Sequence, residues 1–340
     1  MYVARFNLYW YLQVDYSDLS NLLNLLFRAE PWPKPLHQLQ GLNAVRQGED
    51  IERAARAVGT TAKALQLLTC SRDPAADVLR MGIDEIDDVN RKKAKQALGQ
   101  MLLGQSAERA FERIYSSEVQ PQEFELRDVR EGRTDTDYRL LNGKGRPVYR
   151  INIKFHGALF RRAPEMVGLE PSDCFALATY KIHSALQKQE DEQLPYFFAI
   201  VGVRHLSGES VGNELPRDLV EAAALIHQAP KGPSVRNFED RIVDHLVRTS
   251  HPVYMKTFEE VLRADWYILS ARRADQLLRR YLFERVYALK VRNFARAFSG
   301  AEVDMHFSLS RDLIPLKEFL EVLRDQGSTA ITTRLERGGF

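Results

Sequence analysis

The chain has 340 residues, a hydrophobic fraction of 44% and a formal net charge of +2. This length predicts two or three domains, and the small net charge excludes a polycation that binds nucleic acid with its whole surface. Cys70 and Cys174 lie far apart in the sequence, which excludes a disulfide framework or a cysteine zinc site and favours a cytoplasmic location. No apolar run approaches the roughly 20 residues of a membrane span, so we expect no membrane partner.

The first hundred residues predict a mainly helical N-terminal domain, residues 1–103. Residues 6–14 alternate between apolar and polar side chains, which is typical of a strand. Asp18 is a suitable N-cap for a helix that follows it and ends at about Phe27. A further helix is expected from about Val89 through Leu103 into the next segment, bent or broken near Gly104.

Residues 51–70 resemble a helix-turn-helix unit of the repressor type. Ala55 is the small residue expected where the two helices touch, and Gly59 would make the turn four residues later. In such a unit the second helix enters the DNA major groove, and Lys63 and Gln66 would face outward from it. Helix pairs with this Ala-x-x-x-Gly junction are common, so packing without DNA is the alternative interpretation.

Residues 135–156 predict a β-hairpin that gathers polar side chains. The second half alternates and places Asn152 and Lys154 on its polar face. An Asn-Gly pair at 142–143 signals the turn, and a loop centred just after it places Asp137 opposite Asn152. Directly opposed side chains have Cβ atoms about 4.5–5.5 Å apart, so an Asp, an Asn and a Lys would converge on a rigid sheet.

This group of side chains suits the hydrolysis of a phosphodiester. An Asp carboxylate can hold Mg²⁺, a hard ion that prefers oxygen ligands. The metal can acidify a water molecule and offset the charge that grows on the phosphate, while the lysine sits by the scissile phosphate or the attacking water. The alternative is an exposed polar strand face without chemistry.

The flanking segments predict a particular order of elements: helix, three strands, helix, strand. A helix over 104–115 and a strand over 124–129 precede the hairpin. A helix from Glu170 to about Lys188 follows it, with a proline in its first turn. Residues 194–203 are a continuous apolar run, which favours a strand buried on both faces.

These residues resemble the PD-(D/E)xK nuclease superfamily, which includes restriction endonucleases and Holliday-junction resolvases. Its motif is an Asp on the second strand and an acid-x-Lys on the third, with a Glu on the first helix. The resemblance covers the middle third of the chain and implies an α/β (α+β) fold with a restriction-endonuclease-like αβββαβ core over 104–206. It implies catalytic roles for Glu108, Asp137, Asn152 and Lys154, and Mg²⁺ or Mn²⁺ held by Asp137, Glu108 and Asn152.

The sequence departs from this motif at Asn152, which stands where the family has Asp or Glu. An amide offers a carbonyl oxygen without charge, so Glu108 could supply the missing charge, or another acid such as Asp135 or Glu165 could replace it. Alternatively, the site is degenerate and the fold only binds nucleic acid. In the resembled family the helix after the motif can add a lysine, which makes Lys181 a further candidate.

The C-terminal region, residues 207–340, is expected to be mainly helical. Residues 207–213 predict a loop, and helices are expected over 218–227, 238–247 and, in two pieces, 258–298. A strand over 303–309 and a helix over 315–325 follow. The long helical stretch is basic and aromatic, so Arg279, Arg280 and Arg292 are candidates for phosphate contact. The alternative is a solvated basic face with its aromatic side chains in the core.

Together these features predict a metal-dependent DNA endonuclease of a restriction or anti-phage defence type. Such a protein would work with DNA as a homodimer or as a subunit of a defence complex. One alternative is a non-catalytic DNA-binding subunit that keeps the nuclease fold. Another is a nuclease that acts on RNA or branched DNA.

Overall fold

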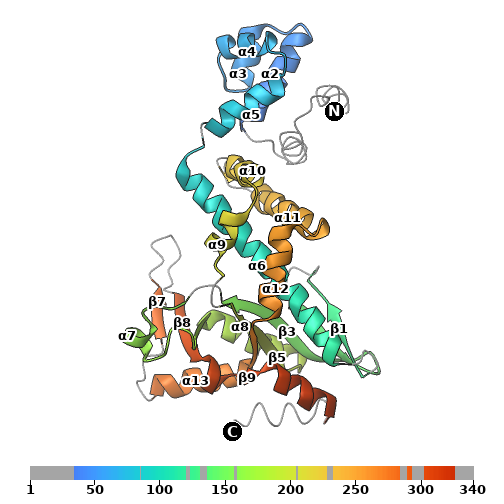
Figure 1. Ribbon diagram of the computed structural model, residues 1–340, viewed down its shortest axis with the longest axis vertical. Helices are drawn as coiled ribbons and strands as arrows, with labels where there is room; N and C mark the ends of the chain where they lie inside the picture. The colour runs from blue at the N-terminus through green and yellow to red at the C-terminus, as the bar shows by residue number, and fades with distance from the viewer. Residues whose placement is uncertain are drawn as a thin grey trace. The chain divides into compact units, whose positions relative to one another are not determined.

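The computed structural model describes residues 34–84, 86–119, 123–130, 136–156, 159–203, 206–227, 233–283, 289–292 and 302–325. The strand expected at 6–14 and the helix expected after Asp18 lie outside these residues. The described chain has a mixed α/β fold (Figure 1). None of its helices is both long enough and apolar enough to span a membrane.

The chain divides into two compact units, and both are discontinuous in sequence. The first unit contains the described residues up to Leu102 together with Gly208–Met255. The second contains Leu103–Ser207 and the described residues from Lys256 onward. The region after residue 207, which the sequence suggested as one segment, is therefore shared between the two units.

The first unit is built from helices. They are α2 (Lys34–Arg46), α3 (Ile51–Ala57), α4 (Ala62–Thr69), α5 (Pro74–Asp84), the first half of α6 (Asp88–Glu118), α9 (Gly208–Glu214), α10 (Arg217–His227), α11 (Pro233–Arg248) and the start of α12 (Pro252–Leu262). Helix α6 is continuous through Gly104, so the expected break there is wrong. A single glycine costs a helix about 1 kcal/mol, which the packing of a 31-residue helix can offset.

Helices α3 and α4 form the helix pair that the sequence predicts. Gly59 has a φ of 68°, the left-handed conformation that glycine adopts without steric cost, and it turns the chain between the helices. The Thr61 hydroxyl caps α4 by accepting a hydrogen bond from the Ala64 N–H at 3.2 Å. Ala55 on α3 and Leu65 on α4 are both buried. The two helices and the turn at Gly59 are confirmed, whereas a helix-turn-helix arrangement of the repressor type and contact with DNA stay predictions.

Helix α9 packs against α6 at backbone distance, and the loop expected at 207–213 is wrong. A Cβ atom added to Gly99 would lie 1.9 Å from the Gly208 carbonyl oxygen. A Cβ atom added to Gly212 would lie 2.1 Å from the Lys95 carbonyl oxygen. These contacts are with backbone atoms, which have no rotamer to change. The tertiary contact thus sustains a helix in a Gly-rich segment of poor helix propensity.

This contact predicts a large effect for a small substitution. We expect Gly99→Ala to lower the free energy of unfolding by about 3 kcal/mol, because the methyl group would force the two helices apart. Gly104→Ala in the same helix is the matched control, since its Cβ would make an ordinary 3.7 Å contact with the Phe155 ring. Urea denaturation measures both variants. Equal stability of the two would show that α6 and α9 are not packed this closely.

The second unit contains a six-stranded sheet in the order β1-β2-β3-β5-β6-β9. Its strands are β1 (Phe124–Asp128), β2 (Tyr138–Asn142), β3 (Pro147–His156), β5 (Tyr196–Gly202), β6 (Asp265–Ser270) and β9 (Ile314–Pro315). Strands β1, β2 and β3 are antiparallel neighbours, whereas β3 and β5 are parallel. Strand β5 is buried along its length up to Gly202, as its apolar sequence predicts. The expected strand at 124–129 is also confirmed.

A second sheet and several helices complete this unit. The sheet has the order β4-β8-β7, formed by Cys174–Ala178, Glu302–Ser308 and Leu289–Arg292. The helices are the second half of α6, α7 (Ala163–Val167), α8 (Thr179–Glu192), α13 (Ala271–Phe283), α14 (Leu309–Asp312), the rest of α12 and a helix over 316–325. The expected strand at 303–309 and the final helix are confirmed. Apolar side chains of β4, α8, β5, α13 and β8 share one core cluster.

Two expected helices are wrong in part because strands interrupt them. The segment from Glu170 contains β4 before α8 begins at Thr179, since Phe175 and Leu177 pair with β8 and enter the core. The basic segment over 258–298 contains β6 between α12 and α13, because β6 pairs with β5. In both cases a partner strand distant in sequence decides the conformation, which local periodicity does not reveal.

Candidate functional site

The hairpin of β2 and β3 positions the central candidate residues. Tyr138 lies opposite Ile151 in the antiparallel register, so Asp137, directly before β2, falls beside Asn152 and Ile153. The Asp137 Oδ2 atom accepts a hydrogen bond of 2.5 Å from the Ile153 N–H. The expected antiparallel pairing of the two motif strands is therefore confirmed, and the carboxylate is fixed against β3.

Lys154 lies on β3 beside this carboxylate. Its ammonium group donates hydrogen bonds to the Asn152 Oδ1 atom and, at 3.0 Å, to the Ile153 carbonyl oxygen. Burial lowers the pKa of Lys154 to about 8, and the positive charge of Lys181 acts in the same direction. The negative charge of Asp137 opposes this shift. Lys154 can therefore exchange a proton near neutral pH, unlike an ordinary lysine.

Glu108 approaches the same place from α6. Burial raises the pKa of Glu108, and the charge of Asp137 raises it further, while the Arg130 guanidinium opposes the shift. Burial also raises the pKa of Asp137, against the lowering effect of Lys154. The two carboxylates are thus near enough to interact electrostatically, in an environment that disfavours their charge. Such perturbed groups are more frequent at functional sites than elsewhere.

The low pKa of Lys154 makes the protein's stability depend on pH. Between about 8 and 10.5 the unfolded chain holds the Lys154 proton while the folded chain has lost it, so stability rises with pH in this window. We expect the unfolding free energy of wild type, relative to Lys154→Met, to increase by roughly 2–3 kcal/mol between these pH values. Urea denaturation at several pH values measures it. A pH-independent difference would contradict the shift, and Lys144→Met at the exposed hairpin turn is the control.

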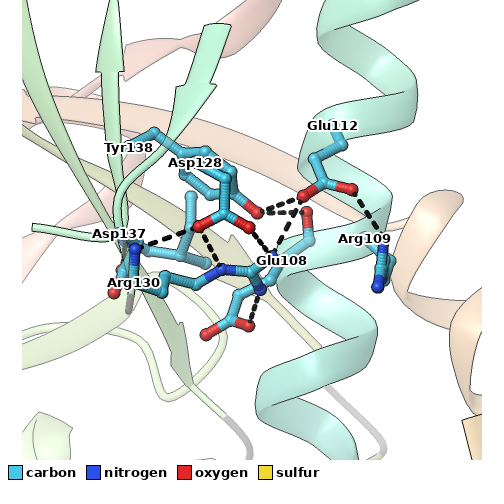
Figure 2. Close-up of polar contacts among 8 residues, drawn as sticks. Glu108, Arg109, Glu112, Asp128, Arg130, Asp137 and Tyr138 are labelled. Atoms are coloured by element: carbon cyan, nitrogen blue, oxygen red, sulfur yellow. Dashed lines mark hydrogen bonds and ion pairs between the residues drawn. The ribbon is translucent and has the colours of Figure 1, made fainter. Parts of the chain in front are cut away.

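Arg130 joins this site, and the sequence analysis did not identify it (Figure 2). Its guanidinium group forms ion pairs with Glu108 and Asp128, and a third with Glu112 at 3.2 Å. It also lies 5.2 Å from the centre of the Tyr138 ring, over its face. Arg130 follows strand β1, and only the tertiary fold brings it beside α6. The single local signal is the pair of acids one helical turn apart on α6.

The chemistry of these donors fits a hard divalent cation. Asp137 and Glu108 offer carboxylate oxygens whose charge is poorly solvated, and Asn152 offers a neutral amide oxygen. The Asn152 oxygen is shared with Lys154 and the Glu108 carboxylate with Arg130. Within the described residues, no group of three or more His, Cys, Asp and Glu side chains could hold a metal. Mg²⁺ or Mn²⁺ would therefore depend on two acids and an amide.

The sequence also suggested two other acids and one lysine as members of the site. Asp135 falls outside the described residues. Glu165 is exposed on α7 and pairs with Arg162 at 3.5 Å, so the structure gives it no place in the site. Lys181 is exposed on α8 and is close enough to Lys154 to lower that residue's pKa. Lys181 thus interacts electrostatically with a residue of the site.

The candidate nucleic-acid contacts do not form one helical face. Lys63 and Gln66 are exposed on α4, as predicted. Arg279 and Arg280 are exposed on α13, and Arg279 pairs with Asp275 at 2.7 Å. Arg292 is at the end of strand β7, so its expected helical position beside the other two is wrong.

In comparisons with protein-family models, curated proteins and solved structures, nothing matches this chain.

Proposed function

We propose that this protein is a metal-dependent nuclease that hydrolyses phosphodiester bonds of DNA. The observation that carries the proposal is the convergence of Asp137, Glu108 and Lys154 around one end of the β2–β3 hairpin. The two carboxyl groups have raised pKa values and the lysine has a lowered one. Groups of this kind suit a reaction in which the protein holds a cation and a phosphate close together. A solvated polar strand face would give none of these three shifts.

The order of elements supports the same proposal. Helix α6, strands β1 to β3, helix α8 and strand β5 follow one another as in the PD-(D/E)xK nucleases, with α7 and β4 inserted before α8. The antiparallel β1-β2-β3 arrangement followed by a parallel β5 also suits that core. The proposal still depends on the side chains of the site, because the same order of helices and strands can serve different functions.

In this proposal each residue has a defined task. Asp137 and Glu108 would hold Mg²⁺ or Mn²⁺ with the Asn152 amide oxygen, and the metal would supply Lewis acidity and an acidified water. Lys154, charged below a pH of about 8, would hold the scissile phosphate or orient the attacking water. The exposed side chains of α4 would bind DNA.

The test is cleavage of plasmid, linear, single-stranded and branched DNA and of RNA, each with Mg²⁺, Mn²⁺ or a chelator. We expect metal-dependent cleavage by the full chain and its loss in Lys154→Ala. Lys144→Ala removes an exposed lysine from the turn of the same hairpin and should cleave as wild type does. Equal cleavage by wild type and Lys154→Ala would overturn the site assignment.

The second candidate is a nucleic-acid-binding subunit without catalysis. The observation that favours it is Asn152, which leaves the metal position one acid short. DNA binding without cleavage of any substrate, with either metal, would make this the better account. The protein would act as a homodimer or as a subunit of a larger defence complex. Sedimentation of the full chain with and without DNA would test for the homodimer.

A further inference from the structure

Three carboxylates from two elements surround a single guanidinium group. Arg130 pairs with Asp128 at the end of β1 and with Glu108 and Glu112, one turn apart on α6 (Figure 2). The Arg130 side chain is 25% exposed, and those of Glu108 and Glu112 are 24% and 27% exposed. Ion pairs with this degree of burial are screened less by water and salt than surface pairs.

Other contacts fix the cluster. The Tyr138 hydroxyl donates a hydrogen bond of 2.8 Å to the Glu112 Oε1 atom, and the Arg130 guanidinium lies over the Tyr138 ring. The Arg130 backbone N–H also donates to the Asp128 Oδ1 atom at 3.0 Å. A planar guanidinium with five donors can satisfy several carboxylates at once, which a lysine ammonium does less well. The guanidinium group is therefore held by the carboxylates at its edge and by the Tyr138 ring at its face.

Glu108 is the carboxylate that links this cluster to the candidate metal position. Its Oε2 atom pairs with the Arg130 Nη1 atom, and its charge is also affected by Asp137. A cation held between Glu108 and Asp137 would thus share one of its ligands with a permanent positive charge. Two cations near one carboxylate repel each other, and each lowers the affinity of the site for the other.

We propose that Arg130 is a positioning residue that orients Glu108 and, by competing for its charge, weakens the binding of a divalent cation by Glu108 and Asp137. This inference rests on the proposed function, because the cation is the one that the nuclease would use. Arg130 keeps Glu108 in place without metal and sets the metal concentration at which the site fills. The ion pairs with Asp128 and Glu112 would hold the arginine in place when Glu108 binds the metal.

The test measures Mn²⁺ affinity of the full chain at pH 8 from the electron paramagnetic resonance signal of the free ion. We expect Arg130→Gln to bind Mn²⁺ about tenfold more tightly than wild type, because one competing charge is gone. Arg127→Gln is the matched control, since Arg127 pairs with the exposed Glu125 on the same strand. It should change the affinity less than twofold. Arg130→Lys keeps the charge and should bind Mn²⁺ nearly as wild type does.

Asp137→Asn separates the two proposals. Unchanged or weaker Mn²⁺ binding by Arg130→Gln, with weaker binding by Asp137→Asn, would overturn the role of Arg130 and leave the metal site standing. No binding by wild type or by any variant would overturn the proposed metal-dependent function as well. If Arg130→Gln does not fold, Arg130→Gln with Glu112→Gln removes one charge of each sign. This double variant should show the same tightening, and its failure to do so would overturn the inference.

Discussion

Asp137→Asn is expected to reduce metal-dependent cleavage by about a thousandfold, which corresponds to roughly 4 kcal/mol of transition-state stabilisation. Asp137 is the carboxylate fixed against β3, and it interacts electrostatically with both Glu108 and Lys154. An asparagine keeps the shape and an oxygen that can accept the Ile153 N–H, so the substitution removes the charge alone. Rates of plasmid cleavage at saturating Mn²⁺ measure the loss.

A stability measurement tests whether this loss comes from unfolding. The pKa of Asp137 is raised in the folded protein, so its contribution to stability decreases as pH rises from the unfolded to the folded pKa. Asp137→Asn should consequently unfold at the same urea concentration as wild type, or a higher one, at pH 7. Glu125→Gln on the exposed face of β1 is the control and should cleave normally. Cleavage by Asp137→Asn at the wild-type rate would place the catalytic centre elsewhere.

Asn152→Asp is expected to strengthen metal binding about tenfold and to increase cleavage with Mg²⁺ most. The substitution adds a third acid where Asn152 offers only an amide oxygen beside Lys154. Mg²⁺ keeps its waters tightly, so it should suffer most from the missing charge, and wild type should prefer Mn²⁺. Cleavage rates across a range of both metal concentrations give the affinities and the maximal rates separately.

Two outcomes would oppose this expectation in different ways. If Asn152→Asp bound metal no better than wild type, residue 152 would not be a ligand. If neither protein cleaved any DNA or RNA while both still bound DNA, the non-catalytic account would become the better one. Asn142→Asp adds the same charge at the hairpin turn, away from the Asp137 end, and should leave metal affinity unchanged.

The sequence could predict those parts of the fold that depend on local pattern. Alternation over β3 and the Asn-Gly pair at 142–143 predicted a hairpin that brings Asp137 beside Asn152, and the structure has this register. The apolar run of β5 and the helix pair α3–α4 were predictable in the same way, because burial and turn chemistry act over a few residues.

The remaining features depend on partners far away in the sequence. Strands β4 and β6 were predicted as parts of helices, because only β8 and β5 make them strands. Arg130 was missed for the same reason, since its three acidic partners come from two elements that meet only in the folded protein. A charged residue after a strand has no local signal that distinguishes a solvated side chain from the centre of an ion-pair cluster.

The second unit is made of two segments that are separated in the sequence, and this affects how it forms during synthesis. Strand β5 is complete at Gly202, but its antiparallel partner β6 begins at Asp265, after the segment Gly208–Met255 of the first unit. At about 5–20 residues per second, a ribosome needs several seconds to make the chain between them. During this time the apolar β5 has a free edge, which can pair with another nascent chain. Overexpressed protein should therefore aggregate at this stage. An added chaperone, or a lower expression level that reduces the number of nascent chains, should improve its recovery.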